Sequence, residues 1–99
     1  MRSDSRLVRK ERIAWRVIEG EAVILGIDQG EVHVLNPVAT RIWELIDGQR
    51  TLGQIAEQIY REFEVDRPQA EADAQEFVET LISRGLVYEA VETGPPRAD

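Results

Sequence analysis

The sequence predicts an α+β domain in which a three-stranded antiparallel sheet precedes three helices, as in a winged helix-turn-helix. Three observations predict this order. Short segments rich in Val, Ile and Trp, separated by tight turns, occupy the first third of the chain. Apolar residues then recur at helical spacing. Residues that cap helices mark where each of the later elements begins and ends.

Each predicted strand is bounded by a turn. The turns are Glu19-Gly20-Glu21 and Asp28-Gln29-Gly30, in which glycine can adopt a positive φ. The middle strand is almost wholly apolar, which is typical of the centre of a sheet. Three strands joined by tight turns form an antiparallel meander. The predicted strands span Ile13–Glu19, Ala22–Ile27 and Glu31–Leu35.

The helix boundaries follow from capping chemistry. Asn36 can accept a free backbone N–H, and Pro37 suits the first helical position. Thr51 and Gln54 have the spacing of a capping box. Gly85 can end the last helix in the left-handed conformation, while either Asp66 or Pro68 could open it. The predicted helices span Pro37–Ile46, Leu52–Glu62 and Gln69–Arg84.

Charge is unevenly distributed along the 99-residue chain. Residues 1–16 carry a net charge of +4, whereas residues 17–99 carry −11. We expect residues 1–12 to be a flexible basic arm, residues 13–91 to form one domain, and residues 92–99, which include the Gly-Pro-Pro sequence, to be a disordered tail. The acidic body would repel phosphate backbones, so we expect no nucleic-acid partner.

Composition excludes several kinds of site. The chain has no cysteine, and His33 is its only histidine, so we expect no metal and no cofactor. No serine or threonine is singled out as a nucleophile for His33 to activate. We therefore expect a binding protein without enzymatic activity. No apolar run is long enough to span a membrane, which makes the cytoplasm the default location.

Two other functions are compatible with a fold of this kind. A winged-helix transcription regulator needs a recognition helix with basic neighbours, but the third predicted helix is acidic apart from Arg84. A small enzyme subunit would need a catalytic centre, and the sequence offers none. With these two functions disfavoured, the third predicted strand is the remaining candidate for a binding site. Its edge could accept a strand from another chain beside a groove lined by the third helix, and it would also permit a strand-exchanged homodimer.

An ordered set of residues resembles the PqqD-like family, whose members are also called RiPP recognition elements. RiPPs are ribosomally made, post-translationally modified peptides. The resemblance covers about Ile13 to Val87 and includes a departure at Asp28-Gln29-Gly30, where pyrroloquinoline quinone members carry a Pro-Glu-Gly-type turn. The matching residues are Leu35-Asn36-Pro37, Ile42-Trp43, Ile46-Asp47-Gly48, Thr51, Ile55-Ala56, Phe63, Val65, Asp73, Phe77-Val78, Leu81 and Gly85-Leu86.

The resemblance implies a peptide chaperone. Such a domain binds the leader of a precursor peptide and presents the peptide to a modifying enzyme, often a radical S-adenosylmethionine enzyme. The leader would add as a strand to the third strand of the sheet and lie against the third helix. The residues implied on or under the two walls of this site are Glu31, Val32, His33, Val34 and Leu35 on the strand, and Asp73, Phe77, Val78 and Leu81 on the helix.

Overall fold

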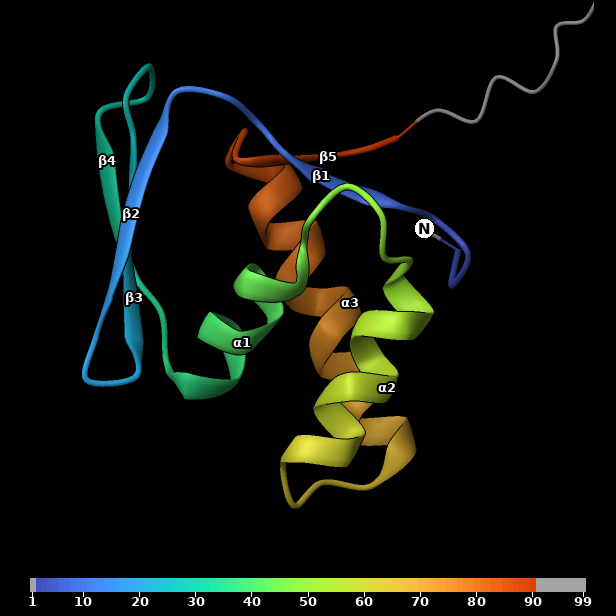
Figure 1. Ribbon diagram of the computed structural model, residues 1–99. Coiled ribbons are helices and arrows are strands. Elements are labelled where there is room, and N and C mark those ends of the chain that lie inside the picture. Colours follow the sequence, from blue (N-terminus) through green and yellow to red (C-terminus); the bar gives the residue numbers. More distant parts are fainter. Residues whose placement is uncertain (1, 91–99) are drawn as a thin grey trace, which may run out of the picture.

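The computed structural model describes residues 2–90 and has the predicted α+β architecture. A three-stranded antiparallel sheet with the order β2-β3-β4 stands at one side of the molecule, and three helices pack beside it (Figure 1). A small second sheet, β1-β5, crosses over the helices. The sheet strands are β2 (Ile13–Ile18), β3 (Glu21–Gly26) and β4 (Glu31–Val34).

The helices begin where their caps predict. They are α1 (Pro37–Leu45), α2 (Leu52–Glu62) and α3 (Arg67–Ser83). The Asn36 side chain accepts the Ala39 N–H, and both halves of the Thr51–Gln54 capping box are present. Of the two alternatives for α3, Asp66 is the cap, because its carboxylate accepts the Gln69 N–H. The third helix therefore starts two residues earlier than expected.

The expected flexible arm is the main correction to the predicted domain layout. Leu7–Arg9 form a strand, β1, that pairs with β5 (Val87–Glu89). Leu7 is fully buried, and its N–H and C=O bond to Arg50 and Gly48. Basic residues surround Leu7 and Val8 in the sequence, so this short apolar segment was not predicted to be a strand that packs on the core. The expected tail, residues 92–99, lies outside the described residues.

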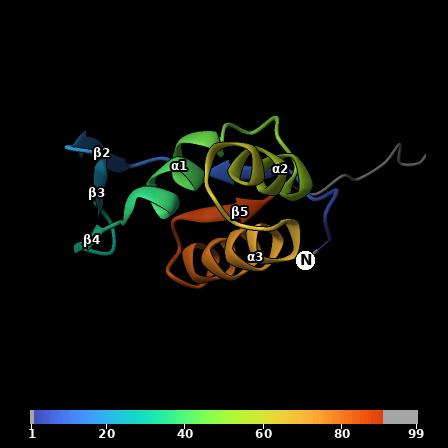
Figure 2. The same ribbon diagram turned by 90° about the horizontal axis from the view of Figure 1, so that it is seen from below.

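The core lies between the helices and continues to the inner face of the sheet. Trp43 is fully buried in this core. Arg41 of α1 makes an ion pair with Glu62 of α2, and this bonded guanidinium lowers the pKa of Glu62 below its usual value. Figure 2 shows α1 lying between the sheet and the other two helices.

Replacing Leu7 with Ala should lower the free energy of unfolding by about 2–5 kcal/mol, because the substitution removes a fully buried side chain. Urea titration followed by circular dichroism measures this change. Val17→Ala, at a half-exposed strand position, is the control and should cost less than about 1 kcal/mol. An unchanged midpoint for Leu7→Ala would instead support the expectation that residues 1–12 are a flexible arm.

The Arg41–Glu62 pair should make stability depend on acidity. Since the folded-state pKa of Glu62 lies below its usual 4.5, the pair stabilises above about pH 4.5 and its contribution is lost as pH falls through the folded pKa. Arg41→Gln should cost about 0.5 kcal/mol at pH 7, as is typical of half-exposed pairs. The difference from wild type should vanish near pH 2. A difference that does not change between pH 7 and pH 2 would contradict this assignment.

Candidate functional site

Strand β4 has an unpaired edge. It pairs with β3 on one side only, in a register that places Val34 opposite Val23 and Val32 opposite Leu25. The Leu35 N–H donates to the Ala22 oxygen at 2.9 Å, so residues 31, 33 and 35 direct their backbone groups at β3. Bonding direction alternates along an antiparallel strand. The N–H and C=O groups of Val32 and Val34 therefore point outward.

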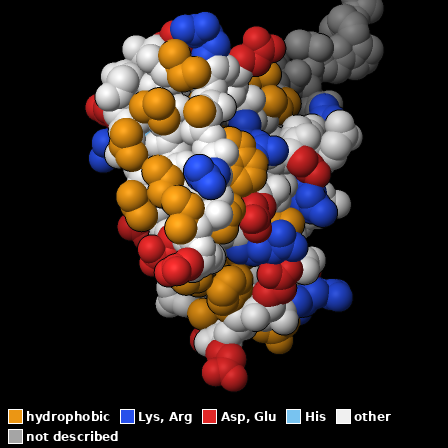
Figure 3. Space-filling model, turned by 60° about the vertical axis from the view of Figure 1, so that its left-hand side comes forward, with side chains coloured by type: hydrophobic (Ala, Val, Ile, Leu, Met, Phe, Trp, Pro, Cys, Tyr) orange, Lys and Arg blue, Asp and Glu red, His pale blue; other side chains and the backbone are white. Residues whose placement is uncertain are grey.

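Side chains alternate in the same way across the sheet. Val32 and Val34 project from the outer face and are 62% and 66% exposed. They continue an apolar surface that includes Ile18 and Leu25, and Figure 3 shows such apolar side chains gathered on one face of the molecule. His33 lies on the inner face and is mostly buried. A strand added at this edge would therefore have one outer and one inner set of side chains.

Thr40 fixes the end of β4 onto α1. Its side chain is buried, its oxygen accepts the Ala22 N–H at 2.8 Å, and its hydroxyl donates to the Leu35 carbonyl at 3.3 Å. The hydroxyl thus takes the place of one ladder bond between β3 and the residue after β4. No pattern in the sequence marks Thr40 for this role. It joins the sheet edge to the helix that forms the floor of the neighbouring groove.

The space between the sheet and the helices is filled on the β2 side. The Arg9 guanidinium lies 5.1 Å from the ring centre of Trp15 and 5.4 Å from that of Trp43. The two indole rings meet edge to face at 5.9 Å. This stack of cation and aromatic rings closes one flank of the molecule. The Arg9 side chain thus lies between the inner face of β2 and helix α1.

The β4 side is open. A cavity of about 400 Å³ begins where β4 ends and runs between α1 and α3. Figure 2 shows β4 as the strand of its sheet on the side of α3. The floor and the apolar parts of the walls come from Val38, Ile42 and the half-buried Phe77. We call this cavity the α1–α3 groove; its lining residues are Asn36, Val38, Ala39, Ile42, Asp73, Glu76, Phe77 and Thr80.

Polar contacts close the space at the far end of β4. The Gln29 side chain donates to the Gly85 carbonyl at 2.9 Å, which ties the β3–β4 turn to the end of α3. Arg84 lies 3.8 Å from Glu31. At the opposite end, the Asp73 carboxylate accepts a hydrogen bond from Gln69. The charges along this side of α3 therefore run from basic near Glu31 to acidic near Asn36.

The expected site residues fall into three groups. Val32, Val34, Asp73 and Phe77 lie at the free edge or line the α1–α3 groove. Glu31 and His33 direct their backbone groups at β3. Leu35, Val78 and Leu81 are buried beneath these surfaces.

Six of the residues that line the groove were not among the expected site residues, and these are Asn36, Val38, Ala39, Ile42, Glu76 and Thr80. Helical spacing from Asp73, at three, four and seven residues, would have indicated the two on α3.

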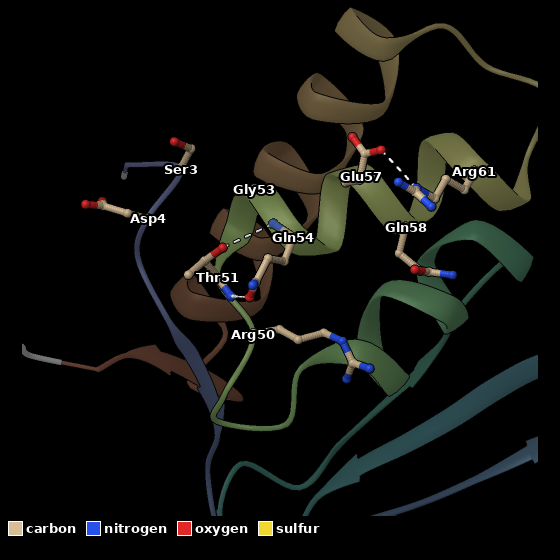
Figure 4. Close-up of a pocket in the computed structure, with 9 residues that line it drawn as sticks. All are labelled: Ser3, Asp4, Arg50, Thr51, Gly53, Gln54, Glu57, Gln58 and Arg61. Carbon is tan, nitrogen blue, oxygen red and sulfur yellow. Dashed lines mark hydrogen bonds and ion pairs between the residues drawn. The ribbon is translucent and has the colours of Figure 1, made fainter.

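A second hollow lies at the start of α2 and is polar. Figure 4 shows Arg50, Gln54, Glu57 and Arg61 around it. The first N–H groups of the helix are not available there, because Leu52 and Gly53 donate to the carbonyls of Ser5 and Ser3. An anion would thus find no free helix-terminal donors among the first residues of α2. The free strand edge and the α1–α3 groove are the better candidate.

Two kinds of feature do not occur within residues 2–90. That part of the chain contains no group of three or more His, Cys, Asp or Glu side chains placed to hold a metal ion. Its helices are also too short or too polar to cross a membrane.

The chain is similar to several known proteins. Residues 21–87 match the family model described as coenzyme PQQ synthesis protein D (PqqD). A PqqA binding protein of Xanthomonas euvesicatoria pv. vesicatoria (strain 85-10) is 38% identical over 53 residues, as is one of Xanthomonas axonopodis pv. citri (strain 306). Those residues are 54% of this chain and 58% of each relative. The chain thus covers little more than half of these relatives.

Solved structures share the fold. TbiB1, in complex with the TbiA(beta) leader peptide, superposes with a TM-score of 0.77 at 27% identity, covering 85% of this chain and 98% of that one. A lasso peptide synthetase B1 complexed with its leader peptide gives 0.74 at 24%, covering 84% and 98%. A heterocyclase in complex with substrate and cofactor gives 0.59 at 26%, covering 96% of this chain but 11% of the enzyme.

Thr40→Val should cost about 1–3 kcal/mol of unfolding free energy, because it leaves the buried Ala22 N–H and the Leu35 carbonyl each without this partner. Thermal or urea unfolding gives the value. Thr80→Val is the matched control, since that hydroxyl is exposed and bonds only within its own helix. Equal stability of the two variants would show that Thr40 does not join α1 to the sheet.

Proposed function

The chain belongs to the PqqD family, and from this premise we propose that it is a non-catalytic peptide chaperone. It binds the leader of a ribosomally made precursor peptide and presents that peptide to a modifying enzyme. One observation carries the proposal: β4 has a free edge, and the α1–α3 groove begins at Asn36, two residues after that strand ends. Such an edge supplies backbone bonds for an added strand, and a groove beside it supplies pockets for alternate side chains.

The site residues divide by role. Val32 and Val34 offer outward backbone N–H and C=O groups, while Glu31, His33 and Leu35 hold the strand against β3. Asp73 and Phe77 contact the guest from the wall of the groove. Val78 and Leu81 support that wall from the core. Structures of TbiB1 and of a lasso peptide synthetase B1, both solved with leader peptides, support a leader as the ligand.

A modifying enzyme is the second proposed partner. In the heterocyclase the similar region is about a tenth of a much longer enzyme chain, so a domain of this kind can be joined covalently to the catalyst it serves. A separate domain would instead raise the local substrate concentration by binding leader and enzyme together. That the enzyme is a radical S-adenosylmethionine enzyme, that the protein works in the cytoplasm and that it forms a homodimer remain predictions.

Charge argues against the transcription regulator. The exposed residues of α3, which would be the recognition helix, include Glu71, Glu76 and Glu79. Such a surface repels the phosphates that provide most of the affinity for DNA. The free β4 edge offers backbone hydrogen bonds to a peptide, whereas the acidic surface of α3 repels a DNA duplex.

A display library that encodes the short open reading frames of the source genome provides the probe. Selection on the wild-type protein should enrich the first part of one short reading frame, and fluorescence anisotropy of that labelled peptide gives its Kd. Val34→Pro should weaken binding by about tenfold or more, since proline removes an outward N–H. The fold should persist, because that N–H has no partner in the sheet.

Two further proline variants make the test specific. Val17→Pro removes an N–H at the opposite free edge, on β2, and should leave the Kd within about twofold. His33→Pro removes a bond to β3 and should lower the unfolding free energy by about 1–3 kcal/mol. If the selected peptide binds Val34→Pro as tightly as wild type, or if no short reading frame is enriched, leader binding at β4 is wrong.

A further inference from the structure

We propose that the α1–α3 groove selects a leader with an apolar residue and a lysine or arginine two positions away from it. This inference rests on the proposed function and adds to it the chemical class of the guest. The apolar residue lies over the floor of the groove, against Val38, Ile42 and Phe77. The cationic residue lies beside Asp73 and Glu76.

Strand geometry sets the spacing. A guest paired with β4 directs every second side chain to the inner face, so neighbouring inward side chains stand about 6.6–6.8 Å apart. Phe77 and Asp73 lie one helical turn apart on α3, a rise of about 6 Å. A guest residue opposite Phe77 therefore has its next inward neighbour near Asp73. The two recognition positions differ by two residues, whichever direction the guest runs.

The two carboxylates differ in their present partners. Asp73 is half-buried and accepts a hydrogen bond from Gln69. Among the described residues, no side chain bonds or pairs with the Glu76 carboxylate, although this residue lines the groove. Bringing an apolar guest beside Glu76 would remove water from an uncompensated charge, which is costly. A lysine or arginine two positions from the apolar residue supplies the missing partner.

The charges at the other end make the selection directional along the groove. Glu31 lies 3.5 Å from His33 and 3.8 Å from Arg84. Since Arg84 already pairs with Glu31, a charged guest residue gains little there. Among the described residues that line the groove, Asp73 and Glu76 are carboxylates without a cationic partner, so the cation of the guest belongs at the end near Asn36.

A random 12-residue peptide library, displayed and selected on the immobilised protein, tests the inference. Sequencing should show an apolar residue paired with Lys or Arg two positions away, in either order. The selection is repeated on Asp73→Asn/Glu76→Gln, where this pairing should disappear. It is also repeated on Glu71→Gln/Glu79→Gln, which removes the same charge from positions of α3 outside the groove and should keep the pairing.

Affinity gives a second measure. One selected peptide should bind Asp73→Asn/Glu76→Gln about fivefold more weakly than wild type, and its Lys→Gln version should lose about as much on the wild-type protein. Persistence of the cation on the groove variant, or its loss on both variants, overturns the inference and indicates attraction by net charge alone. Enriched strand-forming peptides without a cation overturn only this inference. A library that yields no peptide contradicts leader binding as well.

Discussion

The placement of the free β4 edge depends on one buried hydroxyl group. Thr40 accepts from Ala22 and donates to Leu35, so it joins β3, the end of β4 and α1 at a single point. A buried backbone group without a partner costs about 1–3 kcal/mol, and here two are satisfied together. The consequence is geometric. Val38 and Ile42 line the groove and flank Thr40 on the same short helix. Thr40 therefore fixes the position of the β4 edge relative to the groove.

The N-terminal strand makes the molecule asymmetric. Both outer strands of the larger sheet, β2 and β4, expose backbone groups at their free edges. On the β2 side, Arg9 of β1 stacks against Trp15 and Trp43 and fills the space beside the sheet. The α1–α3 groove lies at the other side of the sheet and begins at Asn36, two residues after β4 ends. The segment expected to be a loose arm thus packs on the side of the sheet opposite to this groove.

Local chemistry made much of the fold predictable. Asn36, Thr51 and Asp66 cap their helices through side-chain oxygens that lie a fixed number of residues from their donors. Such signals are contained in a few consecutive residues. Strand β1 could not be found in this way, because its partner β5 lies some 80 residues away and Leu7 is surrounded by charge. Pairings over that distance leave no local pattern.

The same difference between local and long-range signals explains which parts of the candidate site were predictable. The position of β4 as an edge strand followed from the order of the strands, and Asp73 and Phe77 followed from family resemblance. The burial of Trp43 and the role of Thr40 depend on how α1 crosses the sheet, which periodicity within one helix does not record. Glu76 lies on the exposed side of α3, and it lines the groove because the fold places Val38 and Ile42 of α1 across from it.

Energetics show why an edge and a groove are both required. Val32 and Val34 offer four outward backbone groups, and each new hydrogen bond contributes about 0.5–1.5 kcal/mol net. Ordering the backbone of five guest residues costs about 1–2 kcal/mol per residue. Four such bonds contribute about 2–6 kcal/mol against an ordering cost of about 5–10 kcal/mol, so backbone pairing alone does not offset the ordering of a disordered leader. Side-chain burial in the groove, at about 25 cal/mol per Å², must supply the remaining free energy. A guest with the right backbone but the wrong inward side chains would leave β4 unoccupied, so the groove governs which peptide the edge can hold.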